Sequence, residues 1–375
     1  MKICMLTTGH SALDDRIFYK EALSLKKVYN DITIIAPDDN HEYVQDGIRI
    51  IGITKPKSIK ERFAIVDELI KKAVEVNADV YHFHDFEIIY KANKIKKYLP
   101  DAKIVYDVHE HYPDMVRMSR KVPTIIKPLA VWLVDKTELH ISKKFSYIIT
   151  ADDAVKERFK TINDNTDVVY NFSEFDLKSP INYEKEYDVI YQGGITLERG
   201  VFQLVKAIEI ARQTKKDIKM IFVGPFGDEE AKKKVFNYIE EKDLNENIKF
   251  VGKVPHKDVE GYIRKSKVGV VTLLPLPKYF KNIPIKQFEY MSCGIPVVGS
   301  DLPPIKKFLT SYNSGIIVDP TSPKEISEAI IKLVNDLELC EELGNNGIRA
   351  VTEEYNWGNM EKKLIKIYKN IEEIE

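Results

Sequence analysis

The chain has 375 residues, more than one hydrophobic core usually holds, so two domains are the first expectation. Hydrophobic residues make up 44% and charged residues 31%, as in ordinary globular proteins, and the net charge of −1 excludes a global basic field for nucleic acid. Three scattered cysteines without a C-x-x-C pair exclude a disulfide framework and favour a reducing compartment. The apolar start KICMLTT is too short for a signal peptide or membrane span, so we expect a cytoplasmic protein.

Short β-branched or aromatic segments alternate with longer amphipathic segments along nearly the whole chain. The first half predicts strands at 2–7, 31–36, 48–53, 79–84, 103–108, 145–150 and 167–172. The second half predicts strands at 187–192, 218–223, 248–252, 268–274, 295–300 and 315–319. Because the strands are continuously apolar and alternate with helical patterns, we expect α/β architecture with parallel sheets covered on both faces.

A polar stretch at 173–186, SEFDLKSPINYEKE, interrupts this alternation. We interpret 173–186 as a linker between two Rossmann-like domains, at 1–172 and 187–355. An amphipathic C-terminal helix is expected over 356–375, and the pattern does not decide whether it returns to the N-terminal domain. Ligands of open α/β sheets bind beyond the carboxyl ends of the strands, so two facing sheets would form a central cleft.

The segment YDVIYQGGITLERGV (187–201) predicts a strand, a Gly-Gly turn and a helix that begins near Glu198. Gly193 and Gly194 allow a sharp turn and close approach of the backbone to a ligand, and a helix N-terminus offers N–H groups to an anion. Arg199 in the first helical turn opposes the helix dipole, which a bound phosphate would compensate. The alternative is a plain strand-to-helix turn with a solvated arginine.

The segment KNIPIKQFEYMSCGIPVV (281–298) places one carboxylate in an apolar run. Pro284 suits the first helical position, and Lys286, Glu289 and Tyr290 then share one face. Lys286 can pair with a phosphate, and Glu289 can accept two hydrogen bonds from a ribose diol. The alternative is an intrahelical Lys–Glu pair worth roughly 0.2–0.5 kcal/mol.

Histidines gather at predicted strand ends in the first half. They lie in YHFHDFE (81–87), with His82, His84 and Asp85, and in VYDVHEHYPD (105–114), with His109. Metal binding is disfavoured because the H-E-x-x-H spacing of metal-binding helices is missing. At the end of a strand, a single imidazole is instead expected to act on a hydroxyl or a sugar.

The loop after the first strand, TTGHSALDDR (7–16), combines Gly9 with Asp14, Asp15 and Arg16. This loop can close on a polar acceptor. The alternative is a solvated loop in which Asp14 or Asp15 caps a helix.

Segment 115–144 holds seven Lys and Arg residues against two acids, around an apolar core with Trp132. This pattern is typical of an interfacial amphipathic helix pair near anionic lipid. An ordinary packed helix with solvated charges is the alternative.

Taken together, the motifs resemble glycosyltransferase family 4, which has the two-domain GT-B architecture. The similarity extends over nearly the whole chain, and its order and spacing are more specific than any single motif. The motifs are DVYHFHD, VYDVHE, YQGGITLERGV, FVGPFGDEE, PIKQFEYMSCGIPVVGSDLPP and NNGIRAVTEEYNW. The chain is most similar to enzymes that build surface polysaccharides in bacteria and archaea.

The resemblance implies a retaining transfer of a sugar from a UDP- or GDP-sugar to a hydroxyl of a saccharide or lipid-linked saccharide. The N-terminal domain would bind the acceptor and the C-terminal domain the nucleotide sugar. No metal and no cofactor is implied, because fixed positive charge and helix N-termini can stabilise the departing diphosphate. A peripheral contact of 115–144 with the inner face of the membrane would fit a lipid-linked acceptor.

On the donor side, Arg199 matches the basic residue before Gly in the family's phosphate loop. The family's other basic residue falls at Gly194, so Lys286 is the candidate for the second charge. Glu289 matches the second Glu of the E-x7-E pattern, but the first falls at Lys281. Backbone groups would replace it, which completes the predicted donor set: Gly193, Gly194, Arg199, Asn282, Ile283, Pro284, Ile285, Lys286 and Glu289.

On the acceptor side, His109 matches the family's N-domain histidine near the transferred sugar. The predicted acceptor set is Gly9, Asp14, Arg16, His84 and His109, and the predicted catalytic set is His109, Arg199 and Lys286. Two alternatives stay open. One is a nucleotide-sugar 2-epimerase, which needs several acid–base carboxylates where the motifs show few. The other is a non-catalytic nucleotide-sugar-binding subunit, which the Lys281 departure leaves open.

Overall fold

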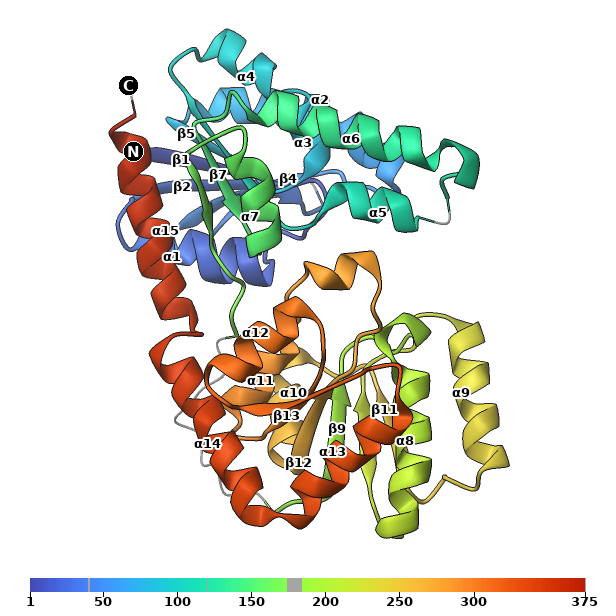
Figure 1. Ribbon diagram of the computed structural model, residues 1–375. Helices are drawn as coiled ribbons and strands as arrows, with labels where there is room; N and C mark the ends of the chain where they lie inside the picture. Colours follow the sequence, from blue (N-terminus) through green and yellow to red (C-terminus); the bar gives the residue numbers. More distant parts are fainter. Residues whose placement is uncertain (40, 120, 174–183, 375) are drawn as a thin grey trace. The chain divides into compact units, whose positions relative to one another are not determined.

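The computed structural model describes residues 1–39, 41–119, 121–173 and 184–374. Contacts divide the chain into two compact units (Figure 1): Met1–Asn171 with Trp357–Glu375, and Phe172–Asn356. Most of the predicted linker 173–186, namely 174–183, lies outside the described residues.

The first unit is built on an eight-stranded sheet with the order β3-β4-β2-β1-β5-β6-β7-β8. All neighbours run parallel except β3 and β4. The strands are β1 (Lys2–Leu6), β2 (Asp31–Pro37), β3 (Glu42–Gln45), β4 (Ile48–Ile53), β5 (Val80–Phe83), β6 (Lys103–Val108), β7 (Tyr147–Thr150) and β8 (Thr166–Val168).

The antiparallel β3–β4 hairpin corrects the expectation of a purely parallel sheet. Gln45 pairs with Ile48, so the loop is Asp46-Gly47, and both residues have positive φ (48° and 74°). An Asp-Gly pair is a strong signal for such a two-residue turn. β3 itself is largely exposed and polar, EYVQ, so its composition carries no strand pattern.

Helical segments cover both faces of this sheet. Alternate residues of β1 enter different cores: Cys4 and Leu6 pack with the core that includes α2, and Ile3 and Met5 with the core that includes η1 and α15. The segments are η1 (Asp15–Ala22), α1 (Leu23–Lys26), α2 (Ile59–Val76), α3 (Phe86–Ile89), α4 (Ala92–Tyr98), α5 (Tyr112–Met118), η2 (Thr124–Ile126), α6 (Lys127–Ser142), α7 (Asp153–Lys160) and α15 (Trp357–Glu372).

The last helix of the chain, α15, belongs to the first unit. Its buried stripe of Trp357, Leu364, Ile367, Tyr368 and Ile371 joins the core that contains Ile3 and Met5. The indole of Trp357 donates a hydrogen bond to Ser24 Oγ (2.9 Å). The helix therefore covers a sheet face that residues 1–171 leave unfilled.

The second unit contains a fully parallel sheet with the order β11-β10-β9-β12-β13-β14. Its strands are β9 (Tyr187–Gln192), β10 (Met220–Val223), β11 (Ile248–Gly252), β12 (Ser266–Val271), β13 (Val297–Ser300) and β14 (Gly315–Val318). The helical segments are η3 (Leu197–Arg199), α8 (Val201–Thr214), α9 (Glu229–Glu241), α10 (His256–Arg264), η4 (Pro277–Phe280), α11 (Lys286–Ser292), α12 (Pro303–Ser311), α13 (Pro323–Asn335) and α14 (Leu337–Glu353).

The strand order in the second unit is that of a doubly wound fold, 3-2-1-4-5-6 in order of appearance. The first unit repeats it in β4-β2-β1-β5-β6-β7. The order reverses beside β1 in one unit and beside β9 in the other, and ligands of such folds bind beyond the carboxyl ends of the strands at this point. The loops after β1, β5 and β9 are therefore the places to look for a site.

Because Leu364 is fully buried in the α15 stripe, we expect Leu364→Ala to lower the free energy of unfolding by about 2–5 kcal/mol. Lys366→Ala, on the exposed side of the same helix, is the matched control and should stay within about 0.5 kcal/mol. Urea unfolding of both variants checks this, and equal stabilities would show that α15 is not part of the core.

Candidate functional site

The turn after β9 is the Gly-Gly loop. It lies at the switch point of the second unit, which is the place where the strand order reverses. Gly193 has φ +105°, a conformation that side chains rarely adopt, and its N–H donates to Val223 O (2.8 Å). The hydroxyl of Tyr191, on β9, donates to Gly194 O (2.7 Å) and fixes the turn to the strand. The loop presents backbone with no side chain at two successive positions.

Two cationic side chains converge on this turn. A β-carbon placed on Gly193 would lie 3.4 Å from Lys286 Nζ and 3.6 Å from Arg199 Nη1. The hydroxyls of Tyr191 and Tyr279 hydrogen-bond the guanidinium of Arg199. The structure thus brings together Gly193, Gly194, Arg199 and Lys286, which the sequence placed in two segments about 90 residues apart.

The sequence pattern placed Arg199 in the first turn of a long helix, but the structure does not. Arg199 ends the short 3-10 turn η3, and α8 begins after Gly200, whose φ is +75°. A β-carbon at Gly200 would collide with Thr272 O, so a residue with a side chain does not fit between η3 and α8. The separate turn holds the guanidinium beside the Gly-Gly loop.

Lys286 is only 7% exposed and lies on α11, which is buried along its whole length. Its ammonium sits 3.9 Å from the centroid of the Tyr191 ring, and no described residue accepts a hydrogen bond from it. Burial, and then the charge of Arg199, lower the pKa of Lys286 to about 7, against the opposing effect of Glu289. A buried ammonium next to a guanidinium is costly unless an anion joins it.

Glu289 lies one turn further along α11 and is also buried. Its carboxylate contacts the side-chain amide of Gln192 at the end of β9, and the neighbouring hydroxyl of Tyr290 accepts a hydrogen bond from Gln192 N (3.0 Å). These contacts fasten α11 to the end of the strand that carries the Gly-Gly turn.

The residues predicted to supply backbone groups, Asn282 to Ile285, form a half-buried irregular segment between η4 and α11. The helix begins at Lys286 with Ile285 at the N-cap, so Pro284 precedes the first turn rather than opening it. Lys281 caps the C-terminal end of η4 and is half-buried.

In the first unit, Arg16 has a different place from the predicted one. It lies on η1, is buried, and its Nε is 2.9 Å from both Asp107 Oδ2 and Glu21 Oε1. Its other nitrogens donate to Asp107 Oδ1 and Val169 O (2.9 Å each). The assignment of Arg16 to the acceptor side is therefore wrong, because carboxylates of the core already engage its guanidinium.

His84 is likewise fully buried, with Nδ1 3.5 Å from Asp107 Oδ2, and burial lowers its pKa to about 4. Its assignment to the acceptor side is also corrected, since no part of the ring reaches solvent. A strand-end position suggested exposure, but Asp107 on the neighbouring strand draws the ring into the sheet.

His109 is the predicted histidine that keeps partial access to solvent. Its side chain is 14% exposed and Nε2 lies 2.8 Å from Asp107 Oδ2. Burial opposes ionisation of Asp107, but Arg16 and His109 outweigh it and hold the pKa of that carboxyl well below its usual range. A charged Asp107 orients the ring, with Nδ1 as the nitrogen left for another partner.

The other two predicted residues of the first loop lie at the same sheet edge. Asp14 caps η1 by accepting from Arg16 N (2.9 Å) and Ile17 N (3.1 Å), as one of the two interpretations expected. Its second oxygen lies 3.0 Å from Nδ1 of His10. Gly9 is exposed, and its N–H donates to Asp85 Oδ2 (3.1 Å).

Sequence reasoning missed His10 and Arg62 at this edge. The ring centroid of His10 lies 5.3 Å from that of His109, and Arg62 on α2 pairs with Asp85 (2.5 Å) and Glu87. His10 stood within the quoted loop TTGH, so its proximity to a strand end was a usable signal. Arg62 lies in an ordinary amphipathic helix and offered no signal.

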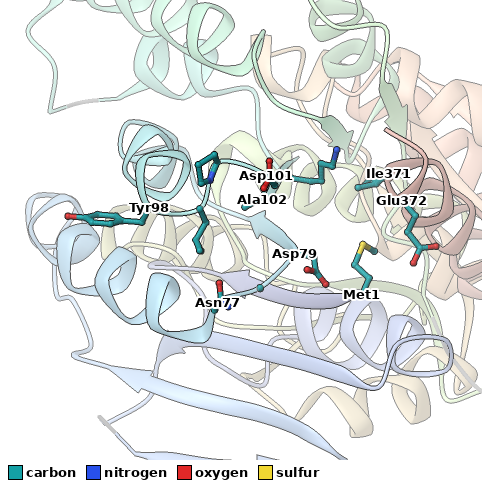
Figure 2. A pocket seen from close by; sticks show the side chains of 12 residues that line it. Met1, Asn77, Asp79, Tyr98, Asp101, Ala102, Ile371 and Glu372 are labelled. Carbon is teal, nitrogen blue, oxygen red and sulfur yellow. The ribbon is translucent and has the colours of Figure 1, made fainter. Parts of the chain in front are cut away.

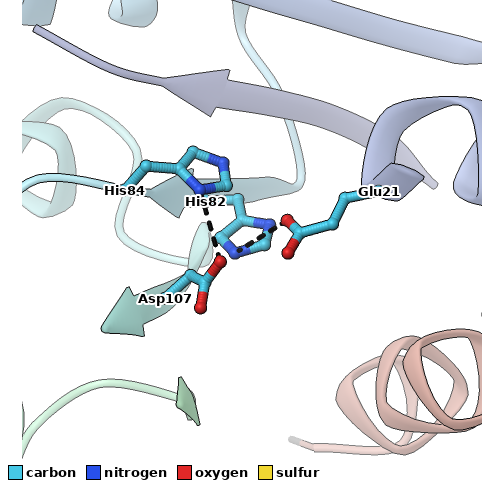
Figure 3. A group of neighbouring side chains, drawn as sticks. All are labelled: Glu21, His82, His84 and Asp107. Atoms are coloured by element: carbon cyan, nitrogen blue, oxygen red, sulfur yellow. Dashed lines mark ion pairs between the residues drawn. The ribbon is translucent and has the colours of Figure 1, made fainter. Parts of the chain in front are cut away.

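Figure 3 shows a buried group of metal-ligand residue types, Glu21, His82, His84 and Asp107, with one candidate ligand atom from each within 4.8 Å of the others. Arg16 already contacts both carboxylates and supplies the positive charge that a cation would bring. Burial, and then Asp107, raise the pKa of Glu21 well above its usual range, which favours a neutral acid. The residues fit a metal poorly, and independence of metal stays a prediction.

Surface pockets open at the other edge of each sheet. One is lined by Met1, Asn77, Asp79, Asp101 and Lys103, at the amino ends of β1, β5 and β6 (Figure 2). Another is lined by Tyr187, Met220 and Ile248, where β9, β10 and β11 begin. Neither pocket lies at the carboxyl ends of the strands, so we do not assign it to the functional site.

If Arg16 is structural, Arg16→Leu should lower the free energy of unfolding by about 3–5 kcal/mol, because it leaves Asp107 and Glu21 buried without their cation. The control Arg49→Leu removes an exposed pair with Glu42 and should cost no more than about 1 kcal/mol. Urea unfolding compares the two, and a fully stable Arg16→Leu protein would return Arg16 to the list of functional residues.

Comparisons with known proteins relate the chain to glycosyltransferases. Residues 172–350, just under half of the chain, match the family model for glycosyl transferases group 1. An uncharacterised glycosyltransferase of Methanocaldococcus jannaschii is 22% identical over 86% of this chain and 83% of that protein. The capsular polysaccharide biosynthesis glycosyltransferase CapM of Staphylococcus aureus is 22% identical over 59% of this chain and 58% of that protein.

Among solved structures, the Anabaena protein HepE in complex with UDP superposes with a TM-score of 0.74 at 16% identity, covering 99% of this chain and 100% of that chain. This likeness shows the fold, which is GT-B with two doubly wound parallel-sheet α/β domains. The predicted fold class is thereby confirmed. The matches together support a glycosyltransferase of the GT-B fold, with the group 1 sequence pattern in residues 172–350.

Proposed function

We propose that the protein is a family 4 retaining glycosyltransferase that works without a metal. It moves a sugar from a UDP- or GDP-sugar to a hydroxyl of a saccharide or lipid-linked saccharide in the synthesis of surface polysaccharide or glycolipid. The observation that carries the proposal is the pair of cations, Arg199 and Lys286, at the Gly-Gly turn of the switch point. Such a site suits a nucleotide diphosphate.

The donor would bind to the second unit, Phe172–Asn356. Its diphosphate lies against the Gly193-Gly194 turn and accepts hydrogen bonds from Arg199 and Lys286. Glu289 binds the ribose diol, and backbone groups of Asn282 to Ile285 hold the sugar. The solved HepE complexes contain UDP and UDP-glucose, which supports a nucleotide sugar as the ligand of this fold.

Transfer on one face of the sugar needs little acid–base machinery from the protein. The bond between the anomeric carbon and the diphosphate oxygen breaks, and the acceptor oxygen forms its bond to the same face of that carbon. The acceptor proton passes to the departing phosphate oxygen. Negative charge grows on the diphosphate as it leaves. Fixed positive charge beside it stabilises this step, and we propose this role for Arg199 and Lys286.

The first unit would bind the acceptor. Its candidate contact is His109, whose ring is oriented by Asp107 and whose remaining nitrogen is left to accept from a sugar hydroxyl. Gly9 and Asp14 lie at the same carboxyl edge of the sheet. Relatives such as CapM, named for capsular polysaccharide synthesis, support a saccharide acceptor.

The function is tested by nucleotide release with UDP-, GDP- and ADP-sugars in the presence of free and lipid-linked saccharide acceptors. A transferase releases the nucleotide only when donor and acceptor are both present, and the product keeps the anomeric configuration. Release of the nucleotide with formation of a free 2-epimer would instead identify the epimerase. Donor binding without any turnover would identify the non-catalytic subunit.

Lys286 is proposed to replace the basic residue that the family carries at Gly194. Lys286→Met should weaken donor binding roughly ten- to a hundredfold, the usual value of a charge-assisted hydrogen bond. Gly194 has an ordinary φ, and a β-carbon there would lie 3.6 Å from Arg199 Nη1, so a side chain fits. We expect Gly194→Arg to restore most of the affinity lost in Lys286→Met, as measured by calorimetry with the best donor of the panel.

Lys324→Met, which removes an exposed lysine of the same unit, is the matched control and should leave donor affinity unchanged. A Lys286→Met protein that binds the donor as tightly as wild type would refute the assignment. A weak Lys286→Met variant that Gly194→Arg does not rescue would show that the two positions are not equivalent.

Donor affinity should also depend on pH. The pKa of Lys286 is about 7 in the free protein, and a bound diphosphate favours the charged form and raises it. Binding then takes up a proton above pH 7, so affinity should be constant below about pH 7 and fall by up to about tenfold per unit above it. The diphosphate of a nucleotide sugar is esterified at both ends and does not titrate in this range. Titration calorimetry from pH 6 to 9 checks this, and Lys286→Met should remove the dependence.

A further inference from the structure

The short turn η2 and the beginning of α6 carry an exposed apolar surface. Ile125 is 90% exposed, Leu129 59% and Trp132 55%, and about half of the surface of Ile126 and Leu133 is exposed as well. We call Ile125, Ile126, Leu129, Trp132 and Leu133 the apolar tip. In Figure 1 the start of α6 lies at the outer edge of the first unit. Soluble domains rarely leave so many large apolar side chains contiguous and uncovered.

The apolar tip continues into a basic stretch on the same face of the helix. Residues at helical spacing after Leu129, Trp132 and Leu133 are Lys136, His140 and Lys143, all exposed. Of the two carboxylates of α6, Glu138 is buried against Arg158 and Tyr106, and Asp135 lies 2.9 Å from Nε of Arg158 and 3.9 Å from Nζ of Lys136. The exposed side of α6, with the residue that follows it, thus combines apolar side chains with more lysines than exposed carboxylates.

The other side of α6 holds the helix on the domain. Val134, Leu139 and Ile141 pack against the core, and Arg158 from α7 binds both acids. The apolar tip is therefore surplus to the packing of the unit, and the helix that carries it is firmly anchored.

We infer that the apolar tip and the basic stretch after it dock on an anionic lipid bilayer. Apolar side chains enter the acyl boundary, the indole suits the interface, and Lys136 and Lys143 meet lipid phosphates. The charge pattern favours this occupant over a second copy of the chain, whose own α6 would bring like charges together. None of the described helices is long and apolar enough to cross a bilayer, so the contact is peripheral.

This inference deepens the proposed function and rests on it in one respect: it assigns the acceptor to the class of saccharides carried on membrane lipids. Docking itself is measured without a donor or an acceptor, so it stands or falls separately from glycosyl transfer.

The chain provides its own probe for the experiment. It has two tryptophans: Trp132 in the apolar tip, and Trp357, which is 4% exposed in the core. A change in tryptophan emission on adding vesicles therefore reports on Trp132. With vesicles of phosphatidylglycerol and phosphatidylcholine we expect a blue shift, and with pure phosphatidylcholine a much smaller one. Trp132→Phe should lose the shift but still float with the anionic vesicles.

Variants separate the apolar and the electrostatic contributions in vesicle flotation. Leu129→Ser with Leu133→Ser should lower the partition coefficient at least about tenfold, and Leu337→Ser, an equally exposed leucine of the second unit, should not. Lys136→Gln with Lys143→Gln should lower it roughly tenfold on anionic vesicles, and Lys324→Gln should leave it unchanged. Circular dichroism and binding of the best donor of the panel, measured on every variant, check that the fold and the donor site are intact.

Three results would overturn the inference. One is the absence of any blue shift or flotation with anionic vesicles. Another is undiminished flotation of the Leu129→Ser, Leu133→Ser protein. The third is a blue shift that grows with protein concentration without vesicles, together with dimers in sedimentation velocity, which would assign the apolar tip to a second copy of the chain.

Discussion

Parallel strand order is the constraint on which both units depend. Every crossover in a doubly wound sheet returns the chain to the same starting edge, so all parallel strands end at the opposite edge. Loops with polar and glycine residues, such as TTGH after β1 and QGG after β9, are thereby collected at the point where strand order reverses. The two surface pockets lie at the amino ends of the strands, so we place the candidate site by strand order and not by pocket position.

Charge is balanced in opposite ways at the two switch points. In the first unit, Arg16 is buried together with Asp107 and Glu21, and its guanidinium lies 2.9 Å from both carboxylates. In the second unit, Arg199 and Lys286 lie together beside tyrosine hydroxyls and the ring of Tyr191, with Glu289 one helical turn away from Lys286. Burial of unsatisfied positive charge costs stability, and we attribute this cost to the binding of an anionic ligand. An arginine at the same edge of a sheet thus has carboxylate partners in one unit and tyrosine partners in the other.

The strands could be predicted from the sequence pattern, since each of the thirteen expected segments overlaps an observed strand. Their apolar runs are a direct consequence of burial on two faces. The strand that was missed, β3, lies at the edge of the sheet and is largely exposed. Its residues therefore do not need the apolar pattern that marks a buried strand. Arg16 and His84 were misjudged because loop and strand-end positions suggest exposure, whereas the partner that buries them, Asp107, is far away in the sequence.

The sequence by itself determined the strands, their alternation with helices and the segments that carry unusual residues, because these depend on local periodicity and on the chemistry of single side chains. The tertiary structure decided which of those residues meet. The placement of Lys286 beside Arg199, the burial of Arg16 and the return of α15 to the first unit all depend on contacts between segments tens to hundreds of residues apart. Only the folded sheets bring such segments within the few ångströms over which charge and hydrogen bonding act.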